Sequence, residues 1–155
     1  MAAGVRDRLA ALAAPLGLTL PEAYLAFVES PPESGILIHH LCSEDDPEEW
    51  WPETIEGLEA DIHRGRGKQR IPYAHYMRAT AEDYLAGGPD VSLPGPGDAQ
   101  FRADRLARGF WIGEEDGDSV FIDQQTLGVF AFLQHDDRVE QWAISFAEFV
   151  AHGQQ

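Results

Sequence analysis

Positive charge is scarce in this sequence. Its 155 residues include 11 lysines and arginines against 27 aspartates and glutamates, which gives a net charge of −16 at pH 7. Binding to nucleic acid needs clustered positive charge on the protein, so we expect no nucleic-acid partner. An acidic surface favours a basic protein partner and speeds the encounter with it. The same charge is also compatible with solubility alone.

Cysteine and long apolar runs are scarce as well. Cys42 is the only cysteine, which excludes an internal disulfide and a Cys-x-x-Cys site. A lone cysteine fits a reducing compartment, so we expect a cytoplasmic protein. No apolar run approaches the roughly 20 residues that a membrane-spanning helix needs, and charges at residues 6–8 interrupt the apolar N-terminal stretch that a signal peptide would require. We expect no membrane association.

Several motifs of enzymes are missing. The sequence contains no Gly-x-Ser-x-Gly elbow, no His-Glu-x-x-His motif, no P-loop and no strand-coupled Gly-x-Gly-x-x-Gly. The acidic stretch from Glu114 fails as a calcium-binding EF-hand loop. Ser119 stands where that loop needs glycine, and Gln125 where it needs the bidentate glutamate. We predict no enzymatic activity and no cofactor.

His39, His40 and Cys42 are the remaining candidates for metal binding or catalysis. Adjacent residues of a strand point to opposite faces, so the two histidines cannot easily bind one ion. His40 and Cys42 share a face, but zinc needs at least three protein ligands, and His63 or His75 could supply a third only if the fold brought it there. The acids that follow Cys42 disfavour its thiolate. We predict no metal site and no catalytic residue.

Hydrophobic spacing predicts helices and one strand in the first third of the chain. Apolar residues share one face of a helix over 5–12. A second helix begins with a capping box of Thr19 and Glu22 and ends at Ser30, before two prolines. Residues 35–41 are apolar on both faces and predict a central strand.

The middle of the chain is harder to interpret. Apolar residues at helical spacing up to Ile62 predict a helix whose cap is Asp46 or Trp51 and which a basic loop over 64–68 ends. Residues 71–77 read as a strand, and a short helix is predicted to begin at Thr80. The length predicts a single domain over residues 1–155, with a Gly/Pro-rich loop around 87–99 inside it.

The last third of the chain alternates between apolar runs and turns. Strands are predicted over 110–113, 119–123, 126–133 and 139–144, and they form an antiparallel meander. A final helix begins with a second capping box, Ser145 and Glu148. Helices followed by strands and a last helix predict an α+β fold, in which N-terminal helices and a C-terminal helix pack against one antiparallel-rich twisted sheet.

Three segments carry a family resemblance: LPEAYLAFVES from residue 20, FWIGEEDGDSVFIDQQTLGVFAF from residue 110 and AISFAEFVA from residue 143. Their order resembles the SUKH superfamily, the family of the yeast cell-wall-assembly regulator and of many bacterial toxin-immunity proteins. The matching positions are Leu20, Pro21, Tyr24, Phe27, Ile112, Gly113, Gly117, Asp118, Gly128, Val129, Ser145, Phe146 and Phe149.

The resemblance implies an α+β fold, no catalytic residues and a function in protein binding. It implies an immunity protein that neutralises a cognate basic toxin, such as a nuclease. The alternative is a regulatory or scaffold protein of the same family without a toxin partner. Arginine outnumbers lysine ten to one, which favours a GC-rich bacterial source. The stretch 64–107 is longer and richer in glycine and proline than the family pattern.

One short segment is the candidate partner-binding site. Residues 44–50 hold five acids, one tryptophan and no base, namely Glu44, Asp45, Asp46, Glu48, Glu49 and Trp50. If Trp51 faces inward on a helix, Trp50 points elsewhere, among these acids. An exposed tryptophan inside an acidic rim is typical of a hot spot for a basic protein. The alternatives are a Trp50 packed under the loop and an interface on the second acidic segment, Glu114–Asp118.

Overall fold

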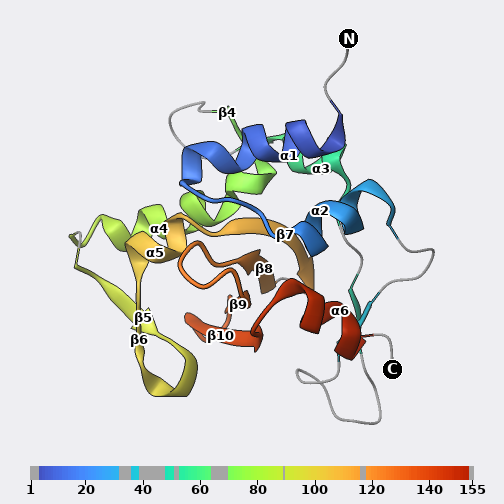
Figure 1. The fold of residues 1–155 in the computed structure, drawn as a ribbon. Coiled ribbons are helices and arrows are strands. Elements are labelled where there is room, and N and C mark those ends of the chain that lie inside the picture. The colour runs from blue at the N-terminus through green and yellow to red at the C-terminus, as the bar shows by residue number, and fades with distance from the viewer. Residues whose placement is uncertain are drawn as a thin grey trace.

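A four-stranded antiparallel sheet lies at the centre of the fold (Figure 1). The computed structural model describes residues 4–31, 36–38, 48–50, 53–63, 70–88, 90–115 and 118–153. The sheet has the order β10-β9-β8-β7 and consists of β7 (Phe110–Glu115), β8 (Asp118–Ile122), β9 (Val129–Leu133) and β10 (Arg138–Ala143). Each strand pairs antiparallel with its neighbour in sequence. The predicted meander and the α+β class are confirmed.

Both faces of this sheet are covered, and all five residues of β9 are buried. On one face, Phe132 contacts Tyr84 of α4 (Tyr76–Leu85), with ring centroids 6.2 Å apart. On the other face, Phe110 contacts Tyr24 of α2 (Glu22–Glu29). Tyr24 also packs edge-on against Phe146, the first residue of α6 (Phe146–Gly153). The core therefore lies on both sides of the sheet, and α4 covers the face that carries Phe132.

The two predicted N-terminal helices are present as α1 (Val5–Ala13), which continues into a 3₁₀ turn, η1 (Ala14–Leu16), and as α2. The predicted capping box of Thr19 and Glu22 is wrong. Helix α2 begins at Glu22, directly after Pro21, and no side chain caps it. Thr19 lies too far from the first helical turn, and the Glu22 carboxylate instead accepts a hydrogen bond from Arg6 at 2.7 Å.

The helix predicted up to Ile62 is mostly wrong. With Asp46 as the cap, strand β2 (Glu48–Trp50) would occupy its start. With either cap, α3 (Ile55–Glu59) is only five residues long and β3 (Asp61–His63) occupies the end of the predicted helix. Thr54 is the N-cap of α3, since its hydroxyl accepts a hydrogen bond from the Gly57 amide at 3.1 Å. Ile55, Leu58 and Ile62 are all buried, but Ile62 is buried from a strand that pairs with Ile71. Burial at a helical spacing therefore arose from two different elements.

The strand predicted over 71–77 is wrong beyond Pro72. Strand β4 (Arg70–Pro72) leads into a 3₁₀ turn, η2 (Tyr73–His75), and α4 begins at Tyr76, four residues before the predicted start at Thr80. Ala74, Met77 and Ala81 are completely buried, and their spacing is that of one helix face. The helical period thus begins earlier than the apolar run suggested.

The prediction of a loop around 87–99 is partly wrong, because residues 92–94 are the first strand of a β-hairpin. Strand β5 (Ser92–Pro94) pairs antiparallel with β6 (Gln100–Arg102) around a 3₁₀ turn, η3 (Pro96–Asp98). Gly97 has a φ of 63° in that turn, a conformation that favours glycine. Helix α5 (Ala103–Ala107) follows directly. The high glycine and proline content therefore reflects a tight hairpin.

The final helix, α6, confirms half of its predicted capping box. The Ser145 hydroxyl accepts a hydrogen bond from the backbone amide of Glu148 at 3.1 Å. The Glu148 carboxylate, however, accepts a hydrogen bond from the backbone amide of Ile144, where the predicted box has the amide of Ser145.

Within the ranges that the structure describes, no helix combines the length and the apolar character needed to span a membrane.

Candidate functional site

The predicted partner-binding segment is only partly described. Glu44, Asp45 and Asp46 lie outside the described residues, as do His39, His40 and Cys42. Glu48, Glu49 and Trp50 form β2, which pairs antiparallel with β1 (Ile36–Ile38). An exposed Trp50 was predicted from a helix in this segment, and that helix is wrong, because residues 48–50 form a strand. The proposal that these residues bind a partner stays a prediction.

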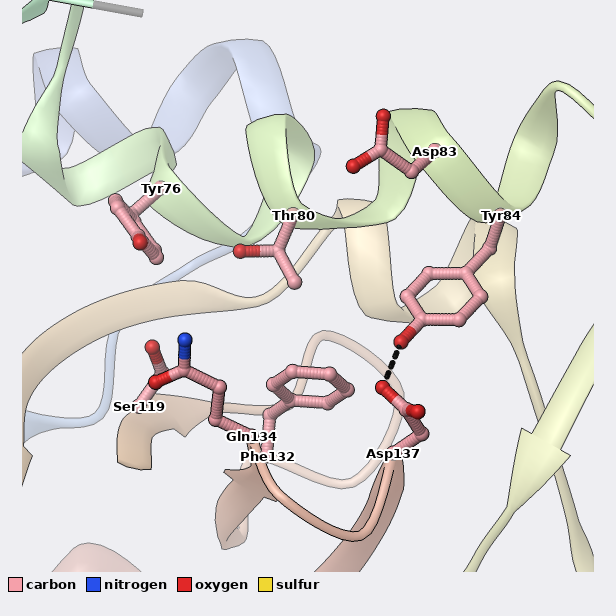
Figure 2. Close-up of a pocket in the computed structure, with 8 residues that line it drawn as sticks. All are labelled: Tyr76, Thr80, Asp83, Tyr84, Ser119, Phe132, Gln134 and Asp137. Atoms are coloured by element: carbon pink, nitrogen blue, oxygen red, sulfur yellow. Dashed lines mark hydrogen bonds between the residues drawn. The ribbon is translucent and has the colours of Figure 1, made fainter. Parts of the chain in front are cut away.

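A second acidic site is described in full. A cavity of about 340 Å³ lies between α4 and the sheet, and we call it the α4 cleft (Figure 2). Helix α4 contributes half of its lining, and strands β8 and β9 with the turn after β9 contribute the rest. The lining residues are Tyr76, Thr80, Asp83, Tyr84, Ser119, Phe132, Gln134 and Asp137.

Helical spacing and strand register bring these residues together. The α4 residues occupy positions i, i+4, i+7 and i+8 from Tyr76, which is one face of a helix. Ser119 of β8 pairs directly with Phe132 of β9, so both side chains emerge on the face of the sheet that α4 covers. Asp137 has a φ of 49° in the turn between β9 and β10. This left-handed conformation is enriched in aspartate and asparagine.

The Tyr84–Asp137 contact closes one end of the cleft. The phenol of Tyr84 donates a hydrogen bond of 2.6 Å to Asp137 Oδ1, as Figure 2 shows. Burial raises the pKa of Tyr84 to about 12, and the hydrogen bond and the charges of Asp137 and Asp83 act in the same direction. Tyr84 is therefore a protonated donor at neutral pH, and it engages only one of the two Asp137 carboxylate oxygens.

Two buried hydroxyl groups lie deeper in the cleft. Ser119 is 5% exposed and Thr80 is 9% exposed, and the Thr80 hydroxyl points into the space between α4 and the sheet in Figure 2. Neither hydroxyl has a hydrogen-bond partner within the described part of the chain. Neither oxygen is among the buried side-chain atoms that lack a partner, so water in the cleft can reach both hydroxyls. A ligand that enters the cleft can take the place of that water as their hydrogen-bond partner.

The cleft has a negative electrostatic character. Asp83 and Asp137 are among its lining residues, and none of the described lining residues is a lysine, arginine or histidine. Asp118, at the start of β8, lies next to the cleft, where its Oδ1 accepts a hydrogen bond from the Gln134 amide at 3.0 Å. The lining also provides no histidine or lysine beside the two hydroxyls to activate them as nucleophiles. This set of groups is suited to binding a cationic group.

A second cavity, of about 410 Å³, has a different character. It lies between α1 and the segment that leads into α2, and apart from Arg6 and Thr19 its lining is apolar or glycine. The Arg6 guanidinium is held by Glu22 and Glu29, so it is not directed at a ligand.

Among the described residues, no three His, Cys, Asp or Glu side chains come close enough to hold a metal ion. His75 is buried, and its Nε2 lies 2.7 Å from the Leu12 carbonyl oxygen.

The α4 cleft was missed by the sequence analysis because α4 was expected to begin at Thr80. Starting the helix at Tyr76 places Tyr76, Thr80 and Tyr84 on one face. That stripe of hydroxyl-bearing residues is the signal that could have found the site.

Comparisons of the chain with protein-family models, with curated proteins and with solved structures find no match.

Proposed function

We propose that this chain is a non-enzymatic protein-binding module whose partner is a basic protein. The observation that supports this most strongly is the α4 cleft, whose described lining has two carboxylates, two hydroxyl groups on largely buried residues and no basic residue. The net charge of −16 also favours a basic partner, because it attracts a cationic protein over longer distances, before contact.

The specific role that we propose is that of an immunity protein, which neutralises a cognate basic toxin such as a nuclease. This role rests on the resemblance to the SUKH superfamily together with the acidic charge. Blocking a cationic active site favours an inhibitor with a large negative field, since electrostatic steering raises the association rate. A regulatory or scaffold protein of the same family, without a toxin partner, is the second candidate, because the resemblance covers both kinds of protein.

A pull-down from the source organism, with mass spectrometry of the captured proteins, tests this proposal. We expect one small basic toxin domain, and the purified pair should form a complex of fixed stoichiometry. Capture of a regulatory protein instead would favour the second candidate. A partner without a basic surface would contradict both the immunity role and the electrostatic argument.

Two acidic surfaces compete for the main contact with that partner. One is the predicted segment 44–50, with Trp50 as its anchor, and the other is the hairpin end at Glu114–Asp118, which adjoins the α4 cleft through Asp118 and Ser119. Charge reversal of Glu48 and Glu49 to lysine, compared with charge reversal of Glu114 and Asp118, assigns the contact. The reversal at the true interface should slow association with the purified partner, and the other reversal should have a much smaller effect.

The salt dependence of the same kinetics tests the steering itself. The Debye length falls from about 10 Å at 0.1 M salt to about 3 Å at 1 M, so the association rate should fall steeply while the dissociation rate changes less. An association rate that is independent of salt would contradict electrostatic steering.

A further inference from the structure

We propose that the α4 cleft binds the side chain of a single arginine that the partner inserts between α4 and the sheet. This inference rests on the proposed function, since it assumes a basic protein partner and names the group that such a partner presents. Three features of the cleft fit an arginine, namely its aromatic walls, its hydrogen-bond acceptors and its charge.

Aromatic rings form the walls of the cleft. Tyr76 and Tyr84 extend from α4 and Phe132 from β9, and the Tyr84 and Phe132 rings are nearly perpendicular, with centroids 6.2 Å apart. Figure 2 shows Thr80 and Tyr84 extending from α4 toward Phe132. A planar guanidinium stacks on aromatic faces, and its apolar stem packs against them. The walls therefore suit both parts of an arginine side chain.

The polar groups of the cleft complement the donors of a guanidinium. Tyr84 occupies Oδ1 of Asp137, which leaves Oδ2 as a free acceptor in the described part of the chain. The hydroxyls of Thr80 and Ser119 are further acceptors that line the cavity. Asp83 is exposed and its carboxylate points away from the sheet in Figure 2, so it contributes negative charge but no direct contact. Arginine carries five N–H donors in a fixed plane and no acceptor, so it can engage carboxylate and hydroxyl oxygens at the same time.

Charge and size exclude other classes of ligand. Two carboxylates repel phosphates and carboxylates, so an anionic ligand is disfavoured. The cavity of about 340 Å³ lies at the small end of the range for ligand pockets, roughly 300–1,000 Å³. This is room for one long side chain rather than for a large cofactor. Lysine would supply the charge, but its ammonium is not planar, so it lacks the stacking surface and the bidentate fork of a guanidinium.

Titration of the full-length ¹⁵N-labelled protein with the capped peptide acetyl-Gly-Arg-Gly-amide tests this proposal. The control peptide carries citrulline, which has the shape of arginine without the charge. We expect saturable shifts of the backbone amides of Thr80, Ser119 and Gln134 with the arginine peptide, and affinity at least about tenfold weaker with citrulline, because charged hydrogen bonds exceed neutral ones. Shifts spread over the acidic surface, or equal affinity for both peptides, would overturn the proposal.

A matched pair of variants locates the binding. Asp137→Asn removes the charge, yet asparagine tolerates the left-handed backbone and its side-chain oxygen can still accept the Tyr84 hydrogen bond. Asp136→Asn makes the same charge change one residue away, at an exposed position that does not line the cleft. We expect Asp137→Asn to weaken binding of the arginine peptide by about tenfold and Asp136→Asn to leave it nearly unchanged. Equal losses in both variants would contradict a specific site.

The same variants separate this inference from the proposed function. If a basic partner is found and Asp137→Asn binds it as tightly as the unaltered protein, the function stands and the arginine site is wrong. If the arginine peptide binds in the cleft but the captured partner has no basic surface, the site stands and the proposed function is wrong.

Discussion

Two carboxylates on the same side of the central sheet differ in how completely they are satisfied. Asp123, directly after β8, is completely buried and accepts four hydrogen bonds. Two come from the Arg105 guanidinium at 2.8 Å each, and two from Thr126. Asp137, in the α4 cleft, accepts one hydrogen bond from the described residues, that of Tyr84. The first carboxylate has every partner that it needs, whereas the second keeps a free oxygen next to a cavity.

The partner of Asp123, Arg105, shows how this fold holds a guanidinium. The Arg105 guanidinium lies 4.5 Å from the centroid of the Phe101 ring and 5.5 Å from that of Phe130. The chain therefore already holds one arginine between a carboxylate and aromatic rings, on the sheet face that also carries Phe132. The α4 cleft presents similar groups without an internal arginine. The difference indicates that Asp123 stabilises the fold and that Asp137 is available for binding.

Substitution of Asp123 should have the largest effect on stability. Asp123→Ala leaves the partly buried Arg105 without its carboxylate and Thr126 without an acceptor, and breaking a buried ion pair costs about 3–5 kcal/mol. Urea unfolding measures the change, and Asp136→Ala is the control, with an expected effect within about 0.5 kcal/mol. If Asp123→Ala is as mild as the control, the ion pair does not stabilise the fold as the comparison requires.

Removal of the Tyr84 hydroxyl should have an intermediate and pH-dependent effect. Tyr84→Phe loses the hydrogen bond to Asp137, which should lower the free energy of unfolding by about 1 kcal/mol at pH 7. The folded-state pKa of Tyr84 is raised to about 12 from 10. The hydroxyl therefore stabilises the fold below pH 10, and this contribution is lost as the pH rises from about 10 to about 12. Urea unfolding across this range should show the two proteins converging, and a constant difference would contradict the role of the phenol proton.

Substitution of Arg6 should have the smallest effect. Arg6 bridges α1 and α2 through Glu22 and Glu29, and the three side chains are 39%, 73% and 48% exposed, respectively. Exposed ion pairs contribute little to stability, and salt screens them. Arg6→Gln should lower the melting temperature only slightly, and the difference should disappear in 1 M NaCl. A large decrease that persists in high salt would mean that this pair behaves like Arg105–Asp123.

The meander was predictable because its alternation and turns are local signals. Strands β7 to β10 and the start of α6 follow from residues that are close in sequence. The segment 46–77 was not predictable in the same way. Ile55, Leu58 and Ile62 match a helical period although they belong to a helix and a strand, and β3 is defined by its pairing with β4. Such pairing is decided by tertiary contacts, which override local propensity.

The candidate site illustrates the same limit. The acidic segment 44–50 was visible as a run of charge, which is a property of sequence alone. The described lining of the α4 cleft combines four residues of α4 with one each from β8 and β9 and two from the following turn. The arrangement becomes apparent only when α4 lies against the strand pair that carries Ser119 and Phe132.

A crystal structure of the full-length protein with acetyl-Gly-Arg-Gly-amide tests the central claim most directly. We predict that the guanidinium lies in the α4 cleft, in contact with the Tyr84 and Phe132 rings and within hydrogen-bond distance of Asp137 Oδ2. A guanidinium bound at segment 44–50 or at Glu114–Asp118, with an empty cleft, would contradict the claim.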